Sequence, residues 1–490
     1  MSDIRSQIKF GTYGWRAIIS DTFTFENVRI VAQATAEWIN HVVENPTGLN
    51  YAANWGPTEI SNTDIKKIVA VGYDNRFLSA EYAQTFAQVL AANGNKVYLS
   101  DTSLPTPALS LGVTSIKGIC GIMITASHNP AKFNGIKIKT ALGGAAPKDI
   151  TSVVESFLGN GEIRNLDFIQ AKEHGLIVVY DFKKEYVKFI RAYLNLKKIK
   201  TAKFKVLADI MHGSGRDLML QILKGTNIKL TLMREDINPS FDGSKPEPIP
   251  ECLGLMMSRM KKEKFDFGHV LDGDADRIAA VMPGGEFVSP QKILGLLILH
   301  LVRNRKVEGG IVKTLCGTTM LDHIARKLDR KLYETPVGFK YISDLMVSEK
   351  IVAGGEEAGG MGLPNYIPER DGTLAGLLLL EMMVYNKRNF KQLVEDMERE
   401  FGRYYYLRLD YTMDAKKIDL NKLKKISAVL GKKVVEVKDF DGVKLICENE
   451  DWLMFRPSGT EPLVRIYSEA KTLKRSKDIL EFGRQQVDPK

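Results

Sequence analysis

The chain has 490 residues, 44% of them hydrophobic and 26% charged, which is an ordinary composition for a soluble globular protein. Its length excludes a single hydrophobic core, so we expect three or four domains. The formal net charge is +10. However, the lysines are scattered and no basic run is interleaved with aromatic residues, so binding to nucleic acid is not indicated.

No part of the sequence indicates a membrane anchor or a disulfide framework. The N-terminal segment MSDIRSQIKF is polar, and the longest apolar run, Ile293 to Val302, is far shorter than the ~20 residues that span a bilayer. We therefore expect a cytoplasmic protein without a membrane segment. The four cysteines are far apart and form no CxxC pair, which predicts free thiols rather than disulfides or a zinc site.

Along the chain, three segments repeat one order of predicted elements: strand, helix, strand, helix, strand and a polar loop. In the first, the strands are 67–74, 96–101 and 118–124, the helices are 80–94 and a segment after Pro105, and the loop is TASHNP. In the second, the strands are 205–213, 228–236 and 267–271, the helices are 216–225 and 253–262, and the loop is DGDADR. In the third, the strands are 311–317, 331–338 and 350–355, the helices are 320–331 and 341–346, and the loop is EEAGG.

Short apolar strands that alternate with helices predict α/β domains with mixed, largely parallel sheets. Ligands of such sheets bind beyond the carboxyl ends of the strands, where each polar loop lies, so we expect the three loops to face one central cleft. After Phe401 the pattern changes to that of a smaller α+β domain. The expected domains are 1–185, 186–290, 291–402 and 403–490, with a loop insertion from about Glu44 to Asn62.

The segment DGDADR places three carboxylates, Asp272, Asp274 and Asp276, within five residues. Carboxylates this close repel one another unless a cation neutralises them, and at strand period the three side chains share one side. Hard oxygen ligands suit Mg²⁺, with Mn²⁺ as an alternative. An EF-hand is excluded because its sixth position would be Arg277 and its twelfth Pro283. The competing interpretation is a solvated acidic turn.

A serine also stands at the end of an apolar strand, in the motif TASHNP. Small neighbours leave Ser127 approachable, while the lack of a G-x-S-x-G pattern gives no indication of a hydrolase nucleophile elbow. Sequence neighbours such as Ser127 and His128 rarely form a catalytic triad. A helix-capping turn therefore remains the alternative to a nucleophile.

A further polar motif, RPSGTE from Arg456 to Glu461 with Arg465 after it, combines cations, hydroxyls and a glycine that frees backbone N–H groups. These groups are the donors that a phosphate needs. The motif therefore predicts a phosphate site, with a surface turn as the alternative.

Taken together, the motifs resemble those of the α-D-phosphohexomutase superfamily, which includes phosphoglucomutase and phosphomannomutase. The matching segments are FGTYGWR, TASHNP, DGDADR, GGEEAGG and RPSGTEP. They occur in the family's order and span nearly the whole chain. The resemblance implies four domains, three of them related α/β units, around a central cleft.

The resemblance also implies a role for each motif. Ser127 corresponds to the phosphorylated serine, which completes a Mg²⁺ site formed by Asp272, Asp274 and Asp276. The residues implied to line the reacting centre are Arg16, His128, Lys137 and Arg277. Those implied to contact the sugar are Lys340, Glu356 and Ala358. Those implied to hold the non-reacting phosphate are Arg456, Ser458, Gly459, Thr460 and Arg465.

The implied reaction interconverts hexose 1-phosphate and hexose 6-phosphate through a phosphoserine enzyme and a hexose 1,6-bisphosphate, which also serves as activator. Lys340 in VGFKY favours glucose phosphates, with mannose phosphates second, and it disfavours phosphoglucosamine, because the VGFKY loop differs from that of the phosphoglucosamine subgroup. Many family members have a serine where this chain has Ala358, which leaves the sugar open and keeps a phosphopentomutase as an alternative. Alternatives from other classes are a metal-dependent sugar phosphatase and a silent sugar-phosphate-binding protein. The expected partners are small sugar phosphates, and the expected state is a monomer or small homo-oligomer.

Overall fold

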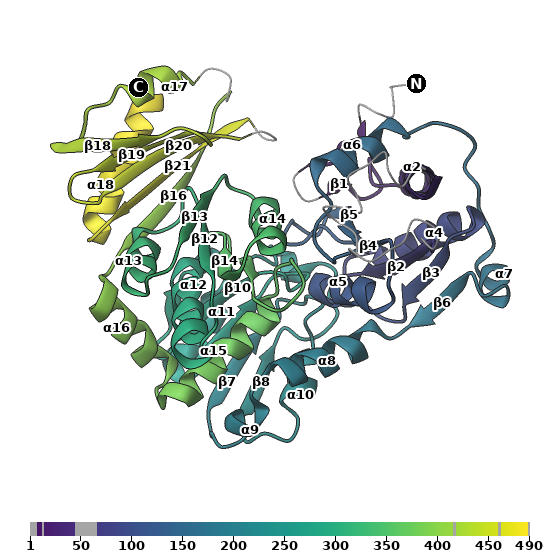
Figure 1. Ribbon diagram of the computed structural model, residues 1–490, viewed down its shortest axis with the longest axis horizontal. Coiled ribbons are helices and arrows are strands. Elements are labelled where there is room, and N and C mark those ends of the chain that lie inside the picture. Colours follow the sequence, from purple (N-terminus) through teal and green to yellow (C-terminus); the bar gives the residue numbers. More distant parts are fainter. Residues whose placement is uncertain (1–6, 12–13, 45–65, 415–417, 459–461, 489–490) are drawn as a thin grey trace. The chain divides into compact units, whose positions relative to one another are not determined.

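The computed structural model describes residues 7–11, 14–44, 66–414, 418–458 and 462–488 (Figure 1). The chain divides into two units. The first comprises Met1–Pro290 with Gly359–Lys391, and the second comprises Gln291–Ala358 with Gln392–Lys490. Among the described residues, no helix combines the length and the apolar character that crossing a membrane requires.

The first unit begins with a six-stranded mixed sheet in the order β1-β5-β4-β2-β3-β6 (Figure 1). Its strands are β1 (Trp15–Ile18), β2 (Ile68–Tyr73), β3 (Lys96–Ser100), β4 (Cys120–Ile124), β5 (Phe133–Thr140) and β6 (Ile177–Tyr180). The pairs among β2, β3, β4 and β6 are parallel, whereas β5 is antiparallel to β4 and β1. The helices beside it are α2 (Phe25–Glu44), α4 (Ser79–Ala92) and α5 (Thr106–Ser115). Because α4 and α5 pack against β2, the central strands are buried, as their unbroken apolar sequences require.

A five-stranded sheet in the order β11-β10-β9-β7-β8 follows in the same unit. Its strands are β7 (Lys205–Asp209), β8 (Lys229–Met233), β9 (Phe267–Leu271), β10 (Ile278–Met282) and β11 (Glu286–Val288). Its helices are α10 (Leu218–Leu223), α11 (Gly254–Lys262) and α15 (Gly372–Asn386), and α15 packs against β9 and β10. The strands β8, β7 and β9 are parallel, but β9 and β10 are antiparallel with Leu271 opposite Ile278. Residues 272–277 are therefore the loop of a β-hairpin.

The second unit contains the parallel strands β13-β12-β14. These strands are β12 (Gly310–Thr314), β13 (Leu332–Thr335) and β14 (Ile351–Gly355). The helices are α12 (Pro290–Leu299), α13 (Thr319–Lys327), α14 (Phe339–Ser348) and α16 (Phe390–Phe401). Most of the apolar run 293–302 is buried, in α12 and the helical turn after it.

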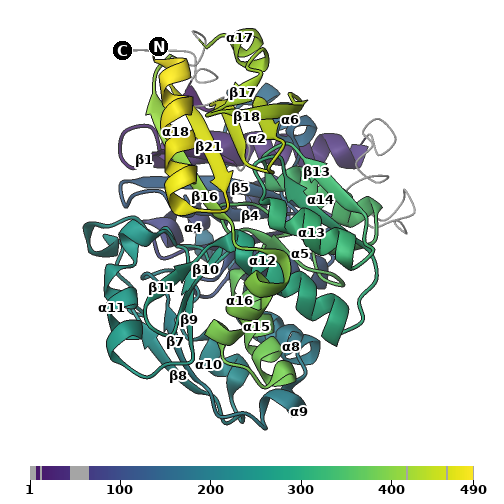
Figure 2. The ribbon, with the colours of Figure 1, turned by 90° about the vertical axis from the view of Figure 1, so that its left-hand side faces the viewer.

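The C-terminal sheet, in the order β16-β21-β20-β19-β18-β17, is antiparallel throughout. Its strands are β16 (Tyr405–Thr412), β17 (Ala428–Val429), β18 (Lys432–Lys438), β19 (Val443–Cys447), β20 (Trp452–Pro457) and β21 (Leu463–Ala470). Helix α18 (Leu473–Val487) covers one face, where Gly483 lies against Leu453 and Ile466 (Figure 2). Trp452, Met454 and Tyr467 alternate with those residues and therefore face the other side.

The predicted three α/β domains and smaller α+β domain are confirmed, and each strand and helix of the repeats has an observed counterpart. The helix predicted over 216–225 is shorter, since α10 spans Leu218–Leu223. The three polar loops follow β4, β9 and β14 as expected. Residues 45–62 of the predicted loop insertion lie outside the described residues.

Candidate active site

Ser127 lies three residues beyond the end of β4, at the carboxyl end of that strand. Its backbone is left-handed, with φ of 53°, and the residue is 1% exposed. The Ser127 N–H donates to Thr125 Oγ1 at 2.9 Å, and its hydroxyl donates to Asp272 Oδ2 at 2.9 Å. The hairpin approaches closely here, because a Cβ on Gly273 would lie 2.5 Å from the Ser127 carbonyl oxygen. The loop that follows β4, residues 125–133 (the serine loop), and the hairpin loop of residues 272–277 (the acidic loop) are therefore in direct contact.

The acidic loop brings its three carboxylates together by turning rather than by strand alternation. Ala275, between Asp274 and Asp276, has a left-handed backbone with φ of 56°. One oxygen from each of Asp272, Asp274 and Asp276 lies within 4.8 Å of the others, and the three residues are 0% exposed. A solvated acidic turn is thus excluded, because these carboxylates are buried.

Cations and hydroxyl groups surround the three carboxylates. Lys137 Nζ, from β5, donates to Asp274 Oδ2 at 2.6 Å and to Asp276 Oδ2 at 3.0 Å. Arg370 Nη2 donates to Asp276 Oδ2 at 2.6 Å. Thr106, in the first turn of α5, donates its hydroxyl to Asp274 Oδ2 at 2.5 Å. The triad is thereby held from three separate segments of the first unit.

The three carboxyl groups differ in proton affinity because their neighbours differ. Burial, with the charges of Asp276 and Asp274, raises the pKa of Asp272 well above its usual range. Burial would also raise the pKa of Asp276, but the charges of Arg370 and Lys137 outweigh it and hold that pKa below its usual range. For Lys137, burial favours the neutral amine, but Asp274 and Asp276 raise its pKa overall. This arrangement keeps Asp276 and Lys137 charged.

The donor set fits a hard divalent cation. Within the described part of the chain, Asp274 Oδ1 and Asp276 Oδ1 are buried without a hydrogen-bond partner. Burying a carboxylate oxygen that accepts no hydrogen bond costs free energy unless a cation binds that oxygen. Three carboxylates with a serine oxygen beside them supply the all-oxygen coordination that Mg²⁺ prefers. The triad can therefore hold a metal ion.

The other residues predicted for the reacting centre also lie at this loop pair. Arg16, from β1, donates through Nη1 to Asn129 Oδ1 at 2.8 Å. Burial, with the charge of Arg277, lowers the pKa of Arg16 to about 10. His128 Nδ1 lies 3.3 Å from Ser127 Oγ, and burial, followed by the charges of Arg277 and Arg16, lowers its pKa well below 6.5. The N–H of Arg277 donates to Asp272 Oδ1 at 3.1 Å.

The predicted sugar residues belong to the second unit. Glu356 directly follows β14 and is 6% exposed, and Ala358 two residues later is partly exposed. Lys340 lies in the first turn of α14, with Nζ 4.6 Å from the centre of the Tyr341 ring. Glu356 and Ala358 therefore lie in the loop at the carboxyl end of β14, whereas Lys340 lies beyond the carboxyl end of β13.

The predicted phosphate residues belong to the C-terminal sheet of the same unit. Arg456 of β20 pairs in register with Arg465 of β21. The Arg456 Nε donates to both carboxylate oxygens of Asp441 at 3.0 Å. Ser458, just beyond β20, is buried. The residues of this motif that lie outside the described residues are Gly459, Thr460 and Glu461.

Comparison with known domain families accounts for most of the chain. Four domains of the phosphoglucomutase/phosphomannomutase group match in order: alpha/beta/alpha domain I over residues 47–164, domain II over 184–285, domain III over 289–401 and the C-terminal domain over 412–484. The chain belongs to the phosphoglucomutase/phosphomannomutase family. It is accordingly a phosphohexomutase, an isomerase that transfers a phosphoryl group within its substrate.

Relatives of this phosphohexomutase carry different sugar names. A "Phosphoglucomutase/phosphomannomutase" of Thermococcus kodakarensis is 28% identical over 421 residues, covering 85% of this chain and 89% of the relative. A "Probable phosphoglucosamine mutase" of Thermococcus gammatolerans is 30% identical, covering 86% and 90%. The crystal structure of a "putative phosphomannomutase" from Thermus thermophilus has a TM-score of 0.84 at 31% identity and covers 100% of both chains. The comparisons therefore establish the reaction class and leave the sugar to be determined.

Two contacts of the phosphohexomutase site did not follow from the sequence motifs. Arg370 and Thr106 contact Asp276 and Asp274, from which they are separated by 94 and 168 positions. Neither belongs to a motif with a distinctive composition. The only local signal is Pro105, which predicted that a helix would begin at Thr106 but not what that helix would face.

Proposed function

We propose that this phosphohexomutase interconverts hexose 1-phosphate and hexose 6-phosphate, with glucose phosphates preferred over mannose phosphates, and that Ser127 carries the phosphoryl group. The observation that supports Ser127 is its hydroxyl, 2.9 Å from Asp272 in a buried cluster of alternating anions and cations. A serine with a purely capping role needs neither the acidic triad nor the cations around it.

The proposed reaction consists of two phosphoryl transfers. In the first, the bond from phosphorus to Ser127 Oγ breaks, a bond to the oxygen of the free sugar hydroxyl forms, and the proton of that hydroxyl passes to Ser127 Oγ. The hexose 1,6-bisphosphate then reverses its orientation. In the second, the other phosphoryl group returns to Ser127 and the sugar oxygen that it leaves is protonated. Atoms and charge balance over the cycle, so bisphosphate is needed only to recharge enzyme that has lost its phosphoryl group.

Within the first unit, Arg16, Lys137 and Arg277 are the cations proposed to offset the charge of the transferring group. Phosphoryl transfer requires mainly positioning and charge stabilisation, and buried, preorganised cations supply both. Lys137, with His128 or Arg16, is the candidate set for handling the hydroxyl proton. Asp272, Asp274 and Asp276 would hold Mg²⁺ beside Ser127, and a bound divalent cation supplies further charge stabilisation to the phosphoryl oxygens.

Within the second unit, the proposal assigns the sugar to Glu356, Ala358 and Lys340, and the non-reacting phosphate to the motif around Arg456. The residues proposed to bind that phosphate are Arg456, Ser458, Gly459, Thr460 and Arg465. A group of cations and backbone donors binds either phosphate of the bisphosphate, which the reversal of orientation requires. Ala358 cannot give a sugar hydroxyl the side-chain hydrogen bond of a serine, so sugar preference is expected to depend on this position.

The test is a substrate panel with two readouts on one sample. Glucose, mannose, glucosamine and pentose 1-phosphates are supplied with Mg²⁺ and catalytic hexose 1,6-bisphosphate, and both isomer formation and free phosphate are measured. We expect isomer without free phosphate, fastest with glucose 1-phosphate. Free phosphate as the main product would indicate a phosphatase, and a fastest pentose substrate would indicate a phosphopentomutase. Ala358→Ser is the matched variant, expected to change the ratio among sugars without abolishing turnover.

A further inference from the structure

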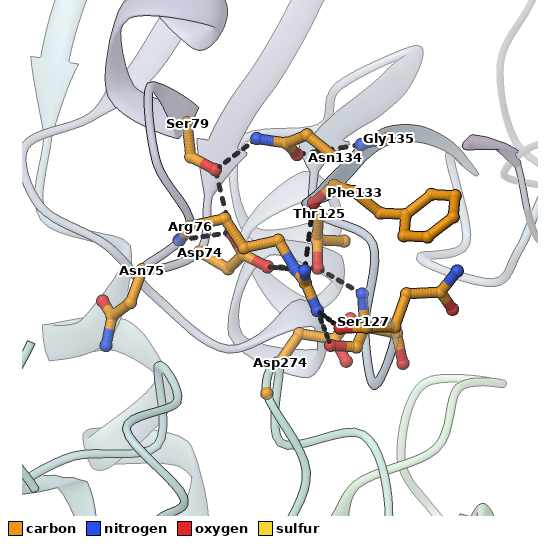
Figure 3. A network of polar contacts seen from close by, with 12 residues as sticks. Asp74, Asn75, Arg76, Ser79, Thr125, Ser127, Phe133, Asn134, Gly135 and Asp274 are labelled. Atoms are coloured by element: carbon orange, nitrogen blue, oxygen red, sulfur yellow. Dashed lines mark hydrogen bonds and ion pairs between the residues drawn. The ribbon is translucent and has the colours of Figure 1, made fainter. Parts of the chain in front are cut away.

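Three consecutive buried residues, Asp74, Asn75 and Arg76, follow the central strand β2 and have no role in the reaction proposed above. They are 2%, 5% and 3% exposed. In a parallel sheet the ends of neighbouring strands meet at one edge, and the Asp74 N–H donates to the Ile124 carbonyl at the end of β4 at 3.1 Å. The segment therefore lies directly beside the serine loop (Figure 3).

The guanidinium group of Arg76 donates hydrogen bonds to four backbone carbonyls of the serine loop (Figure 3). Its Nη2 donates to the carbonyls of Ser127 at 2.7 Å and Asn129 at 2.5 Å. Its Nη1 donates to the carbonyls of Pro130 at 2.9 Å and Phe133 at 3.0 Å. A planar group with a fixed fork of donors can satisfy four carbonyls at once, which an ammonium cannot do in the same geometry. The loop is thus closed around Arg76.

Asp74 fixes both Arg76 and the serine backbone. Its Oδ1 accepts from the Arg76 N–H at 3.0 Å and from the Ser79 hydroxyl at 2.9 Å, and its Oδ2 lies 3.3 Å from Arg76 Nε. The same Oδ2 accepts from Thr125 Oγ1 at 2.5 Å, and Thr125 Oγ1 accepts from the Ser127 N–H at 2.9 Å. Asp74 is therefore connected to the backbone of Ser127 through a single hydroxyl.

Asn75 contacts the segment His212–Gly213, which packs against the acidic loop. Its Nδ2 donates to the carbonyls of His212 and Gly213, each at 2.9 Å. Gly213 lies so close to the hairpin that a Cβ would be 2.8 Å from the Asp272 carbonyl and 2.7 Å from that of Gly273. Three consecutive residues thus contact the serine loop on one side and the support of the acidic loop on the other.

The conformation that these contacts hold is one that serine does not favour. A left-handed backbone at a non-glycine residue, as at Ser127, is unfavourable and persists only when surrounding contacts impose it. Here Arg76 holds the Ser127 carbonyl, and Thr125 holds its N–H. The result of those two contacts is the position of Ser127 Oγ next to Asp272.

We propose that Asp74, Asn75 and Arg76 are positioning residues that set Ser127 Oγ against the acidic loop for phosphoryl transfer. The inference rests on the proposed role of Ser127 as phosphoryl carrier. It predicts that weakening these contacts slows transfer to and from Ser127 while substrate binding is little affected. In the described part of the chain, the residues proposed to hold the sugar and the non-reacting phosphate are not among the contacts of this segment.

The first test compares Arg76→Lys with Arg191→Lys. Arg191 is the matched control, since its guanidinium also holds three backbone carbonyls, those of Gln221, Ile222 and Lys224. A misplacement of about 1 Å costs about 100-fold in rate, so we expect Arg76→Lys to lower kcat about 100-fold with KM within about threefold. Arg191→Lys should leave both unchanged.

The second readout separates positioning from mere loss of folded enzyme. Dephosphorylated enzyme is mixed with glucose 1,6-bisphosphate, and intact mass follows the phosphorylated fraction with time. A positioning defect lowers the rate constant and leaves the final fraction unchanged, whereas a folding defect lowers the final fraction. An unchanged rate constant in Arg76→Lys would overturn the proposal.

Two variants of Thr125 test the proposal if Arg76→Lys does not fold. Thr125→Val keeps the shape but removes the hydroxyl between Asp74 and Ser127, and loss of a hydrogen bond of about 1 kcal/mol predicts about a fivefold slower phosphorylation of Ser127. Thr125→Ser keeps the hydroxyl and should restore the wild-type rate. Equal rates in the two variants would contradict the proposal. Failure of the underlying function looks different, because Ser127→Ala would then remain phosphorylated and active.

Discussion

Replacing Arg370 with methionine should destabilise the first unit by about 3 kcal/mol, and Mg²⁺ should restore much of that loss. Arg370 Nη2 and Asp276 Oδ2 are 2.6 Å apart, and the two side chains are 2% and 0% exposed. With charge centres about 4 Å apart and an effective dielectric constant of about 20, their attraction is about 4 kcal/mol. Breaking a buried pair typically costs about 3–5 kcal/mol. Lys137, 3.0 Å from the same oxygen, still pairs with Asp276, so the lower end of that range is expected.

The assay is urea-induced unfolding with and without Mg²⁺. Arg234→Met is the matched control, because Arg234 pairs with the buried Asp209 at 2.5 Å outside the acidic triad. Both variants should lose stability in chelator, and Mg²⁺ should stabilise Arg370→Met more than Arg234→Met, since in Arg370→Met a bound cation also replaces the lost charge beside Asp276. A loss below about 1 kcal/mol, or an equal Mg²⁺ response in the two variants, would refute the reasoning.

Three further predictions concern other groups. Burial raises the pKa of Asp371 from 3.8 to about 6, so the folded state retains a proton that the unfolded chain releases, and this contribution to stability is lost as pH rises from about 4 to 6. Relative to Asp371→Asn, the wild type should lose about 1.3 kcal/mol of unfolding free energy between pH 5 and pH 7 in urea titrations, and a constant difference would contradict this. Asp274→Asn should raise the Mg²⁺ concentration for half-maximal mutase activity at least about tenfold, equivalent to ~1.4 kcal/mol, and an unchanged value would reject Asp274 as a ligand. Arg456→Ala removes a charge-assisted contact of about 1.5–3 kcal/mol, so we expect apparent substrate affinity to fall about tenfold or more and dependence on added hexose 1,6-bisphosphate to increase; steady-state kinetics in which neither changes would reject this phosphate site.

Local patterns in the sequence were sufficient to predict the repeated α/β order and the loops at the strand ends. Apolar runs such as Cys120–Ile124 and Phe267–Leu271 can only be buried strands in this context, and both are. The shape of the acidic loop was not predictable in the same way. Strand alternation gave the correct grouping of Asp272, Asp274 and Asp276, but the observed loop is a hairpin turn with a left-handed Ala275.

The supporting residues could not be predicted because their contacts join distant segments. In the sequence, Arg76 is an ordinary arginine after a strand. The backbone carbonyls that it binds lie 51 or more positions later in the chain. Arg370 is separated by 94 positions from Asp276. One sequence gives the chemical type of such residues but not which of many arginines is buried against which carboxylate. Only the paired register of the strands brings them together.

The most direct test of the account is the phosphorylation of Ser127 itself. Enzyme incubated with glucose 1,6-bisphosphate and Mg²⁺ should gain one phosphoryl group in intact mass, and peptide mapping should place that group on Ser127. Glucose 1-phosphate added afterwards should remove it. Ser127→Ala should neither gain the group nor interconvert glucose 1-phosphate and glucose 6-phosphate, although Mg²⁺ should still stabilise it against urea. Full mutase activity in Ser127→Ala, or a phosphoryl group on another residue that turns over at the rate of catalysis, would contradict the central claim.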